Sequence, residues 1–520
     1  MREIKLLVVL SCITLASFAQ KPVLRIDFEN RKSIATVKGI NGKAFNLGNV
    51  PGRLAFAVKN PIRSKASFTI TLWVKGNPNA RRSYDILTGV TMVEKRGLGW
   101  KPRVIRGIEK IETGAFNGWK FGMQRDGAWR FTARGGGFTY DYAPTPGRQS
   151  IRNGDWHLLA VSYDNNASEL RFYYDGEQVA IYYAPELTDM VSSDSLTVGN
   201  SIDSDHDYRK IAWDSFYGQI DDIEIYDRVL DKNEISKYYR ALTGIVLPES
   251  IRAPLATLKV TAFNILNGGY ESGKDVGIER VIELIKQDAA DILTLVETYG
   301  SGEKIADALG YQLYLVSSNL SIVSRYPIAN TYRIFKPFNS GGALVNLPGG
   351  ESVNIFSVWL NSRPRYNELY QESNVDLGKY LVTEYETRGQ EMDLILEEMG
   401  AHLSQSDEVP LIIGGDFNSG SHLDWTKKTS DIHNGHVVPW PVSMAAADAG
   451  LLDGYRVLHP DPLNVPGRTH TIRNDRIDYI YFKGKKIKPL SANIINEHNV
   501  QFPSDHYGVS VLFRYEVTLK

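Results

Sequence analysis

The sequence has very little cysteine: among its 520 residues there is one, Cys12. Cys12 lies in an apolar stretch near the N-terminus that we predict to be removed after export. Without it, the remaining chain cannot form disulfides and has neither a cysteine nucleophile nor a thiolate metal ligand. Any catalytic or metal-binding chemistry must therefore use oxygen and nitrogen side chains.

The sequence also lacks an excess of charge of either sign. It contains 59 Lys and Arg residues and 60 Asp and Glu residues, so its formal net charge is −1. No global basic field attracts polyanions, and long nucleic acid is therefore not favoured as a partner, although local patches remain open. After residue 19, no apolar run reaches the roughly 18 residues that a membrane span requires.

Residues 1–19 have the composition of a signal peptide. Arg2 and Lys5 precede an apolar centre, and the segment closes on the small residue Ala19, after which cleavage is predicted. The protein is therefore expected to be exported to the periplasm, the cell surface or the extracellular space. Lipoprotein anchoring through Cys12 is the less favoured alternative, because the apolar run before it is short.

Residues 21–242 contain short alternating stretches separated by Gly, Asn and Asp, a pattern typical of β-strands and turns. The clearest predicted strands are Phe68–Val74, Trp156–Tyr163 and Glu169–Tyr174. Asp175-Gly176 after the last of these predicts a hairpin turn. With few helical stretches, the pattern favours a β-sandwich or jelly roll. The Gly- and Arg-rich segment 95–137 is expected to be a long loop.

Several stretches in this part resemble laminin-G-like, concanavalin A-type jelly-roll domains. They are Ile70–Val74, Trp156–Asp164, Tyr174–Gly176, Phe216–Ile223 and Tyr226–Leu230 followed by Glu234-Ile235. The resemblance implies a many-stranded sandwich of a kind that often binds carbohydrate or protein, with a structural spacer as the alternative. Asp203, Asp205 and Asp207 alternate, and they either offer oxygen ligands to Ca²⁺ or form a solvated acidic loop.

The pattern changes after a short helix expected over 235–242. Residues 243–254 combine Gly, two Pro and mixed polarity, and are predicted to be a linker. From 255 to 520, strand-like and helix-like stretches alternate, which favours one α/β domain.

The stretch Leu411–Ser419 is central to this second domain. Three apolar residues run into Gly414-Gly415, so a buried strand is predicted to stop there at a tight turn. Asp416 and Asn418 then stand at the carboxyl edge of a sheet. A carboxylate that accepts a proton from water and an amide that bonds an oxyanion suit metal-assisted hydrolysis, whereas helix capping is the alternative.

Other predicted strands of this domain also end or begin with polar residues. These residues are Asn264, Glu297, Asp478 and the pair Asp505-His506. Each alone is a common turn former. Their occurrence together in one α/β domain favours a shared pocket.

The set resembles the endonuclease/exonuclease/phosphatase superfamily, whose members are also called DNase I-like. The resemblance is carried, in the order typical of the family, by Phe263–Gly268, Leu295–Thr298, Ile322–Ile328, Gly415–Ser419, Arg476–Ile480 and Ser504–Tyr507. It implies a four-layer α/β sandwich, with two sheets packed between helices and a site at the upper edge of the sheets.

The resemblance also implies a metal site. Glu297 would bind the ion, with Asn264 and Asp505 in support. Mg²⁺ or Mn²⁺ is expected, because these hard cations prefer oxygen ligands.

Four further residues would carry the reaction in the family's arrangement. Asp416 would position or deprotonate the attacking water, and Asn418 would donate a hydrogen bond to a phosphoryl oxygen. Asp478 would fix the tautomer of His506, whose imidazole would stabilise the charge that develops on the phosphoryl group.

The chain departs from the family where a strand-end histidine is usual, because Trp359 occupies that position. An indole has no acceptor nitrogen and cannot act as an acid or base. Altered chemistry, stacking on a substrate and loss of turnover are the competing explanations. The groups near site strands that could substitute are Arg363, Arg365, His422 and His470.

Three residues are predicted to contact substrate: His422, Arg363 and Trp359. For His422, a neutral packed imidazole is an equal alternative. Asp453 and His470 are otherwise expected to be structural.

Together these features predict an exported, divalent-metal-dependent phosphoric ester hydrolase. A phosphodiesterase acting on a phosphate-bearing glycan, a lipid headgroup or a similar ester is favoured. One alternative is a secreted nuclease. The other is a non-catalytic carbohydrate-binding surface protein with a degenerate hydrolase domain.

Overall fold

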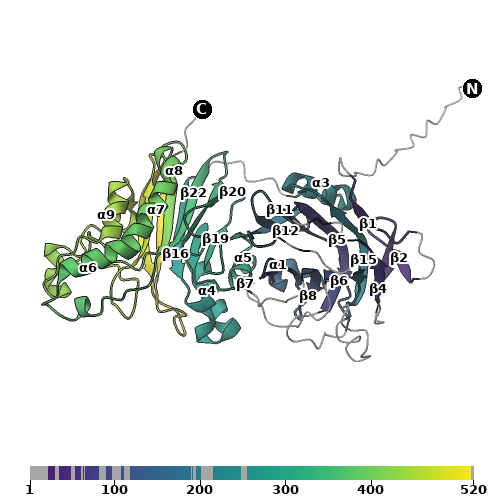
Figure 1. Ribbon diagram of the computed structural model, residues 1–520, viewed down its shortest axis with the longest axis horizontal. Helices are drawn as coiled ribbons and strands as arrows, with labels where there is room; N and C mark the ends of the chain where they lie inside the picture. Colours follow the sequence, from purple (N-terminus) through teal and green to yellow (C-terminus); the bar gives the residue numbers. More distant parts are fainter. Residues whose placement is uncertain are drawn as a thin grey trace, which may run out of the picture.

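The computed structural model has two regions that follow one another along the chain, drawn side by side in Figure 1. The N-terminal region is built mainly of strands, whereas the C-terminal region combines strands with several helices. The structure describes residues 21–29, 34–48, 53–59, 62–63, 65–80, 90–96, 107–110, 117–188, 190, 195–200, 215–247 and 255–516. The predicted signal segment 1–19 with Cys12, and the candidate calcium ligands Asp203, Asp205 and Asp207, lie outside the described residues.

Two sheets with antiparallel neighbours form the N-terminal region. The first contains, in spatial order, β2 (Thr36–Lys38), β3 (Lys43–Asn46), β15 (Gly218–Tyr226), β5 (Phe68–Gly76), β11 (His157–Asp164), β12 (Glu169–Tyr174) and β13 (Glu177–Tyr183), with β1 (Leu24–Ile26) on β15. The second contains β4 (Leu54–Ala57), β14 (Ser195–Val198), β6 (Val90–Arg96), β8 (Gly118–Met123), β9 (Trp129–Gly135), β10 (Phe138–Tyr142) and β7 (Ile108–Lys110).

Aromatic side chains fill the space between these sheets. Phe172 of the first sheet lies with its ring centroid 4.5 Å from Tyr142 and 6.0 Å from Phe131 of the second. On the outer face of the first sheet, Trp73 stacks on Tyr239 of α3 (Lys232–Thr243) at 5.8 Å. The predicted β-sandwich is confirmed.

The expectation of a long loop over 95–137 is wrong for much of that segment. β8 and β9 pair along their whole length, from Gly118↔Arg134 to Met123↔Trp129. The reason lies in an alternation that the Gly and Arg content obscured: Trp119, Phe121 and Phe131 point inward at every second residue and are buried. Residues 97–106 and 111–116 lie outside the described part.

The C-terminal region also contains two sheets. One comprises β18 (Gln312–Leu315), β19 (Leu320–Ser324), β17 (Ile292–Val296), β16 (Thr257–Asn264), β27 (Gly508–Tyr515) and β26 (Ile487–Ile495). The other comprises β20 (Ile328–Arg333), β21 (Ser340–Asn346), β22 (Ser352–Trp359), β23 (Leu411–Asp416), β25 (Asp478–Lys483) and β24 (Leu452–Asp453).

The two sheets face each other across an aliphatic core. Val260 and Ile292 of the first sheet pack in one cluster with Ile355, Ile412 and Ile480 of the second. Helices cover both outer faces, α4 (Lys274–Asp288) and α5 (Gly302–Leu309) on the first sheet and α7 (Gln390–Glu398) and α9 (Pro441–Asp448) on the second. The predicted four-layer α/β sandwich is confirmed (Figure 1).

The remaining α-helices of the described residues are short. They are α1 (Pro146–Gln149), α6 (Leu377–Glu384), α8 (Gly400–Ser404) and α10 (Gly454–Leu458). Within the described part of the chain, no helix combines the length and the apolarity needed to cross a membrane.

The two regions share one continuous sheet, which the sequence did not indicate. β13 of the sandwich pairs in parallel with β18 of the α/β region, with Ala180 beside Leu313 and Tyr182 beside Leu315, to give a 14-stranded sheet. Polar contacts reinforce the junction, because the Asp307 carboxylate accepts hydrogen bonds from Gln149 Nε2 at 2.6 Å and Arg148 Nε at 3.1 Å.

Glu303, in the first turn of α5, is buried at this junction with an exposed fraction of 3%. Burial, with repulsion from Asp141 of the sandwich, raises its pKa from 4.5 to about 7. The native state therefore holds this proton more tightly than the unfolded chain does. Stability is expected to fall as pH rises through that interval, by about 3 kcal/mol in total.

Glu303→Gln is expected to raise the free energy of unfolding at pH 8 and to change it little at pH 4, where the carboxyl is protonated in both states. Denaturant titrations at the two pH values measure the difference. Glu279→Gln, on the exposed face of α4, is the control and should shift stability by less than about 0.5 kcal/mol at either pH. Equal effects of Glu303→Gln at both pH values would contradict the assignment.

Candidate active site

The polar residues predicted at strand ends come to one edge of the two packed sheets. β16 and β17 run parallel, so Asn264 lies beside Val296 and Glu297 follows directly. In the other sheet, the parallel pair β22 and β23 ends with Trp359 beside Asp416, and the antiparallel β25 begins opposite, at Asp478. The direction of the strands therefore collects these side chains.

Asn264 connects the two sheets at this edge. Its amide nitrogen donates to Glu297 Oε1 at 3.1 Å and to Asp416 Oδ2 at 3.2 Å. One neutral amide thus holds two carboxylates that come from different sheets. Asp416 also accepts hydrogen bonds from the backbone N–H of Asn418 at 2.8 Å and from its side-chain amide at 3.0 Å.

Gly414 and Gly415 serve sheet packing and not the turn that the sequence suggested. β23 continues through both of them to Asp416. A Cβ at Gly414 would lie 2.3 Å from Thr294 Oγ1 of the facing sheet, and one at Gly415 would lie 1.9 Å from the carbonyl oxygen of Val358 on the neighbouring strand. Glycine is required at Gly414 because no side chain fits between the layers, and at Gly415 because none fits against the neighbouring strand.

Two of the site residues have a left-handed backbone. Glu297 has φ of 58° and Asn418 has φ of 51°, and this conformation is uncommon for glutamate. Hydrogen bonds hold both in place: Glu297 N–H donates to Asn319 Oδ1 at 3.0 Å, and Asn418 Nδ2 donates to the Leu360 carbonyl at 3.0 Å. Such conformations gather at functional sites because the surroundings must enforce them.

His506 lies between two buried carboxylates. Its Nδ1 is 2.9 Å from Asp478 Oδ2, and its Nε2 is 3.9 Å from Asp416 Oδ2. Burial opposes a charge on the ring, but Asp478 and Asp416 outweigh it and raise the pKa of His506 to about 10. Burial, with repulsion from Asp478, raises the pKa of Asp416 to about 7. The site thus contains an imidazolium donor and a carboxylate that can accept a proton near neutral pH.

Each of the two regions matches a known protein family. Residues 52–236 match the concanavalin A-like lectin/glucanases superfamily, and residues 261–506 match the endonuclease/exonuclease/phosphatase family. The second region is an endonuclease/exonuclease/phosphatase domain. The resemblances inferred from the sequence are confirmed, in the predicted order.

Individual relatives are distant. An uncharacterized protein of Caenorhabditis elegans is 24% identical over 286 residues, which cover 48% of this chain and 90% of that protein. A truncated C. elegans TDP2 covers 50% of this chain and 97% of its own, with 17% identity and a TM-score of 0.35. The match to an AP endonuclease from Archaeoglobus fulgidus covers 50% of this chain and 100% of that protein's chain, with 16% identity and a TM-score of 0.35.

The donor atoms of the endonuclease/exonuclease/phosphatase domain fit a hard divalent cation. Glu297, Asn264 and Asp505 offer only oxygen ligands, which Mg²⁺ and Mn²⁺ prefer. Asp505 Oδ1 is buried without a hydrogen-bond partner among the described residues, and Ser504 Oγ fixes this segment to the Asn264 carbonyl at 2.8 Å. These residues would hold the ion.

Acidic and imidazole groups also gather in two sets within the described chain. The ligand atoms of each set lie within 4.8 Å of one another: His470, Asp505 and His506 in the first, and Asp416, Asp478 and His506 in the second. Glu297 belongs to neither set and reaches Asp416 through Asn264.

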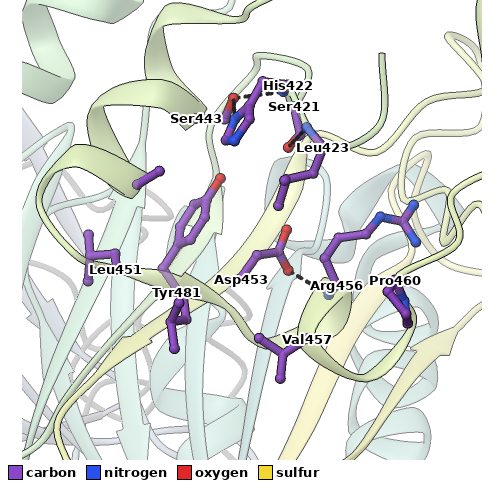
Figure 2. A pocket seen from close by; sticks show the side chains of 12 residues that line it. Ser421, His422, Leu423, Ser443, Leu451, Asp453, Arg456, Val457, Pro460 and Tyr481 are labelled. Atoms are coloured by element: carbon purple, nitrogen blue, oxygen red, sulfur yellow. Dashed lines mark hydrogen bonds between the residues drawn. The ribbon is translucent and has the colours of Figure 1, made fainter. Parts of the chain in front are cut away.

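His422 lies in a separate cavity of about 310 Å³, shown in Figure 2. Its Nδ1 is 2.8 Å from Ser443 Oγ of α9, and Asp453, Arg456 and Tyr481 line other walls. The contacts of His422 therefore connect it with this cavity and not with the Asp416 cluster.

The other two predicted substrate contacts are placed differently. Trp359 ends β22 beside Asp416, and its half-buried ring packs edge-on against Phe338 at 5.5 Å. Its indole nitrogen has no hydrogen-bond partner among the described residues. The Arg363 side chain is exposed in the segment after β22.

Sequence reasoning favoured a structural role for His470, but the fold brings this residue to the site. Its ring lies 4.7 Å from that of His506, edge to face. The available signal was its proximity in sequence to Asp478. Sequence reasoning also missed Arg476, a fully buried side chain that pairs with Asp424 at 2.8 Å and Asp453 at 2.6 Å and so anchors the start of β25.

Mg²⁺ or Mn²⁺ is expected to raise the melting temperature, because an ion that binds only the folded protein stabilises it. Glu297→Gln should weaken this effect, with the apparent ion affinity falling at least about tenfold for the loss of a charged ligand. Thermal melts across an ion titration measure both. The control Glu271→Gln, at an exposed position nearby, should respond like the wild type, and an unchanged response in Glu297→Gln would exclude Glu297 as a ligand.

Proposed function

We propose that the protein is an exported, divalent-metal-dependent phosphodiesterase. Membership of its second domain in the endonuclease/exonuclease/phosphatase family supports phosphoester hydrolysis as the reaction type. The observation that carries the proposal is the Asp478–His506–Asp416 arrangement, in which an imidazolium with raised pKa stands beside a carboxylate that can accept a proton.

Asp416 accepts a proton from the attacking water in this proposal. Its raised pKa places proton transfer close to neutral pH, where a general base is most effective. Asn264 and Asn418 fix the orientation of this carboxylate through hydrogen bonds of 3.2 and 3.0 Å. A bound divalent cation supplies positive charge that neutralises the phosphoryl oxygens.

His506 donates from Nε2 to the phosphoryl group, while Asp478 holds its Nδ1. Asn418, predicted as a second donor, already uses both amide hydrogens on the Leu360 carbonyl and on Asp416 Oδ2. We therefore assign Asn418 to positioning the base, which leaves the phosphoryl group in need of another donor.

For the substrate, we propose a phosphate-bearing glycan or a lipid headgroup. The concanavalin A-like region supports a glycan partner, and the formal net charge of −1 does not favour long nucleic acid. Export is supported by the composition of residues 1–19.

Asp416→Asn is expected to lower kcat on bis-p-nitrophenyl phosphate by about 10³-fold, because the general base is lost. The melting temperature is also expected to fall, because both carboxylate oxygens accept hydrogen bonds from Asn264 or Asn418 and the new amide nitrogen would face one of these donors. Asp291→Asn is the matched control: Asp291 is buried at the opposite end of the sheet, where it pairs with Arg325, and activity should persist. Retained activity in Asp416→Asn would contradict the mechanism.

The same assay tests the function as a whole. Hydrolysis of bis-p-nitrophenyl phosphate that needs Mg²⁺ or Mn²⁺ and stops with a chelator is the expected result. Rapid nicking of plasmid DNA would instead identify a secreted nuclease. No activity on phosphorylated glycans, lipids, nucleotides or synthetic esters with any divalent ion would reject the hydrolase.

A further inference from the structure

The turn from Thr469 to Asp475 is fixed directly against the Asp505-His506 segment. The backbone of His470 forms isolated antiparallel β-bridges with the backbones of His506 and Asp475. The backbone N–H of Thr471 donates to the Asp505 carbonyl at 3.0 Å, and that of Tyr507 donates to the Thr469 carbonyl at 2.6 Å. His470 is therefore held beside His506 by the main chain on both sides.

The hydrogen bonds of His470 determine which ring nitrogen carries the proton. The backbone N–H of Arg473 donates to His470 Nδ1 at 3.0 Å, so Nδ1 is an acceptor. In a neutral imidazole the hydrogen then sits on Nε2, which becomes a donor.

This tautomer argues against His470 as a metal ligand. A ring nitrogen of His470 lies within 4.8 Å of ligand atoms of Asp505 and His506, as a metal site would require. However, the Nδ1 lone pair is used by Arg473, and Nε2 carries a hydrogen. The ring can therefore donate a hydrogen bond at the site but cannot ligate an ion without breaking its contact with the main chain.

The surroundings of His470 favour an anion. Arg473 is half-buried, its guanidinium reaches the Asn418 carbonyl at 3.4 Å, and no carboxylate pairs with it among the described residues. Arg365 is exposed and likewise has no ion pair in the described chain. Arg473 and Arg365 thus place two positive charges without an ion pair in the described chain around His470, whose ring also lies near the Asp505 carboxylate.

We infer that His470 contacts the substrate, with its Nε2–H donating a hydrogen bond to a non-bridging oxygen of the phosphoryl group. This residue supplies the donor that Asn418 cannot offer while it holds Asp416. The inference rests on the proposed phosphoester hydrolysis for its role in turnover. Anion contact by His470 does not depend on turnover.

The experiment combines kinetics and binding in the full chain. His470→Ala should lower kcat/KM on bis-p-nitrophenyl phosphate by about 10²-fold, the loss typical of one oxyanion donor. His470→Gln, which keeps an N–H donor, should recover most of that loss. His422→Ala, in the separate cavity, is the matched control and should retain wild-type values.

Histidine ¹⁵N NMR of the wild type, titrated with inorganic phosphate in the presence of Mg²⁺, gives an answer that needs neither turnover nor a folded variant. His470 should show the Nε2–H tautomer, and its Nε2 resonance should shift as phosphate binds. An Nδ1–H tautomer, or a resonance that phosphate leaves unmoved, would overturn the inference.

The two proposals fail in different ways. If phosphate shifts the Nε2 resonance of His470 but no ester is hydrolysed, the phosphodiesterase proposal is wrong and the anion contact of His470 is supported. If esters are hydrolysed and His470→Ala matches the wild type, the function stands and the role of His470 falls. The pH–rate profile of His470→Gln should keep the wild-type shape, because His470 exchanges no proton; a lost ionisation would contradict its role as a fixed donor.

Discussion

The close approach of two sheets at Gly414 is the constraint on which the site depends. A side chain at this position would meet Thr294 of the facing sheet. With the layers this close, the Asn264 amide reaches Glu297 and Asp416 at the same time. A wider separation would leave the same residues present but unconnected, because hydrogen bonds weaken steeply beyond about 3.5 Å.

The charges at this edge of the sheets explain why the site would bind a cation. Asp416 and Asp478 are buried, and the His506 imidazolium is the positive group that lies between them. Burial first, and then repulsion from Asp478, raises the pKa of Asp416. A divalent cation on the Glu297 side would bring the positive charge that this arrangement lacks.

Local patterns in the sequence were enough to predict a β-rich domain followed by an α/β domain, and the strand ends that carry polar residues. The four-layer arrangement was predicted only from the resemblance to a known family. Local patterns could not predict contacts that depend on distant parts of the chain. The pairing of β13 with β18 joins two edge strands, and the sequence of an edge strand does not indicate which strand will pair with it. His470 belongs to a turn whose position is set by hydrogen bonds to the segment before β27, so its place at the site followed only from the tertiary structure. The glycine pair was recognised as a turn, but the packing of Gly414 against the facing sheet and of Gly415 against the neighbouring strand depends on the tertiary structure.

The central claim is that Glu297, Asn264 and Asp505, at one edge of the first sheet, hold one divalent cation next to Asp416 of the second sheet. Anomalous diffraction from crystals soaked in Mn²⁺ tests it most directly. The account predicts one strong peak bonded to Glu297 at about 2.1 Å, close to Asp505 and separate from the His470 ring. A peak ligated by His470, or no peak near Glu297 at millimolar Mn²⁺, would contradict it.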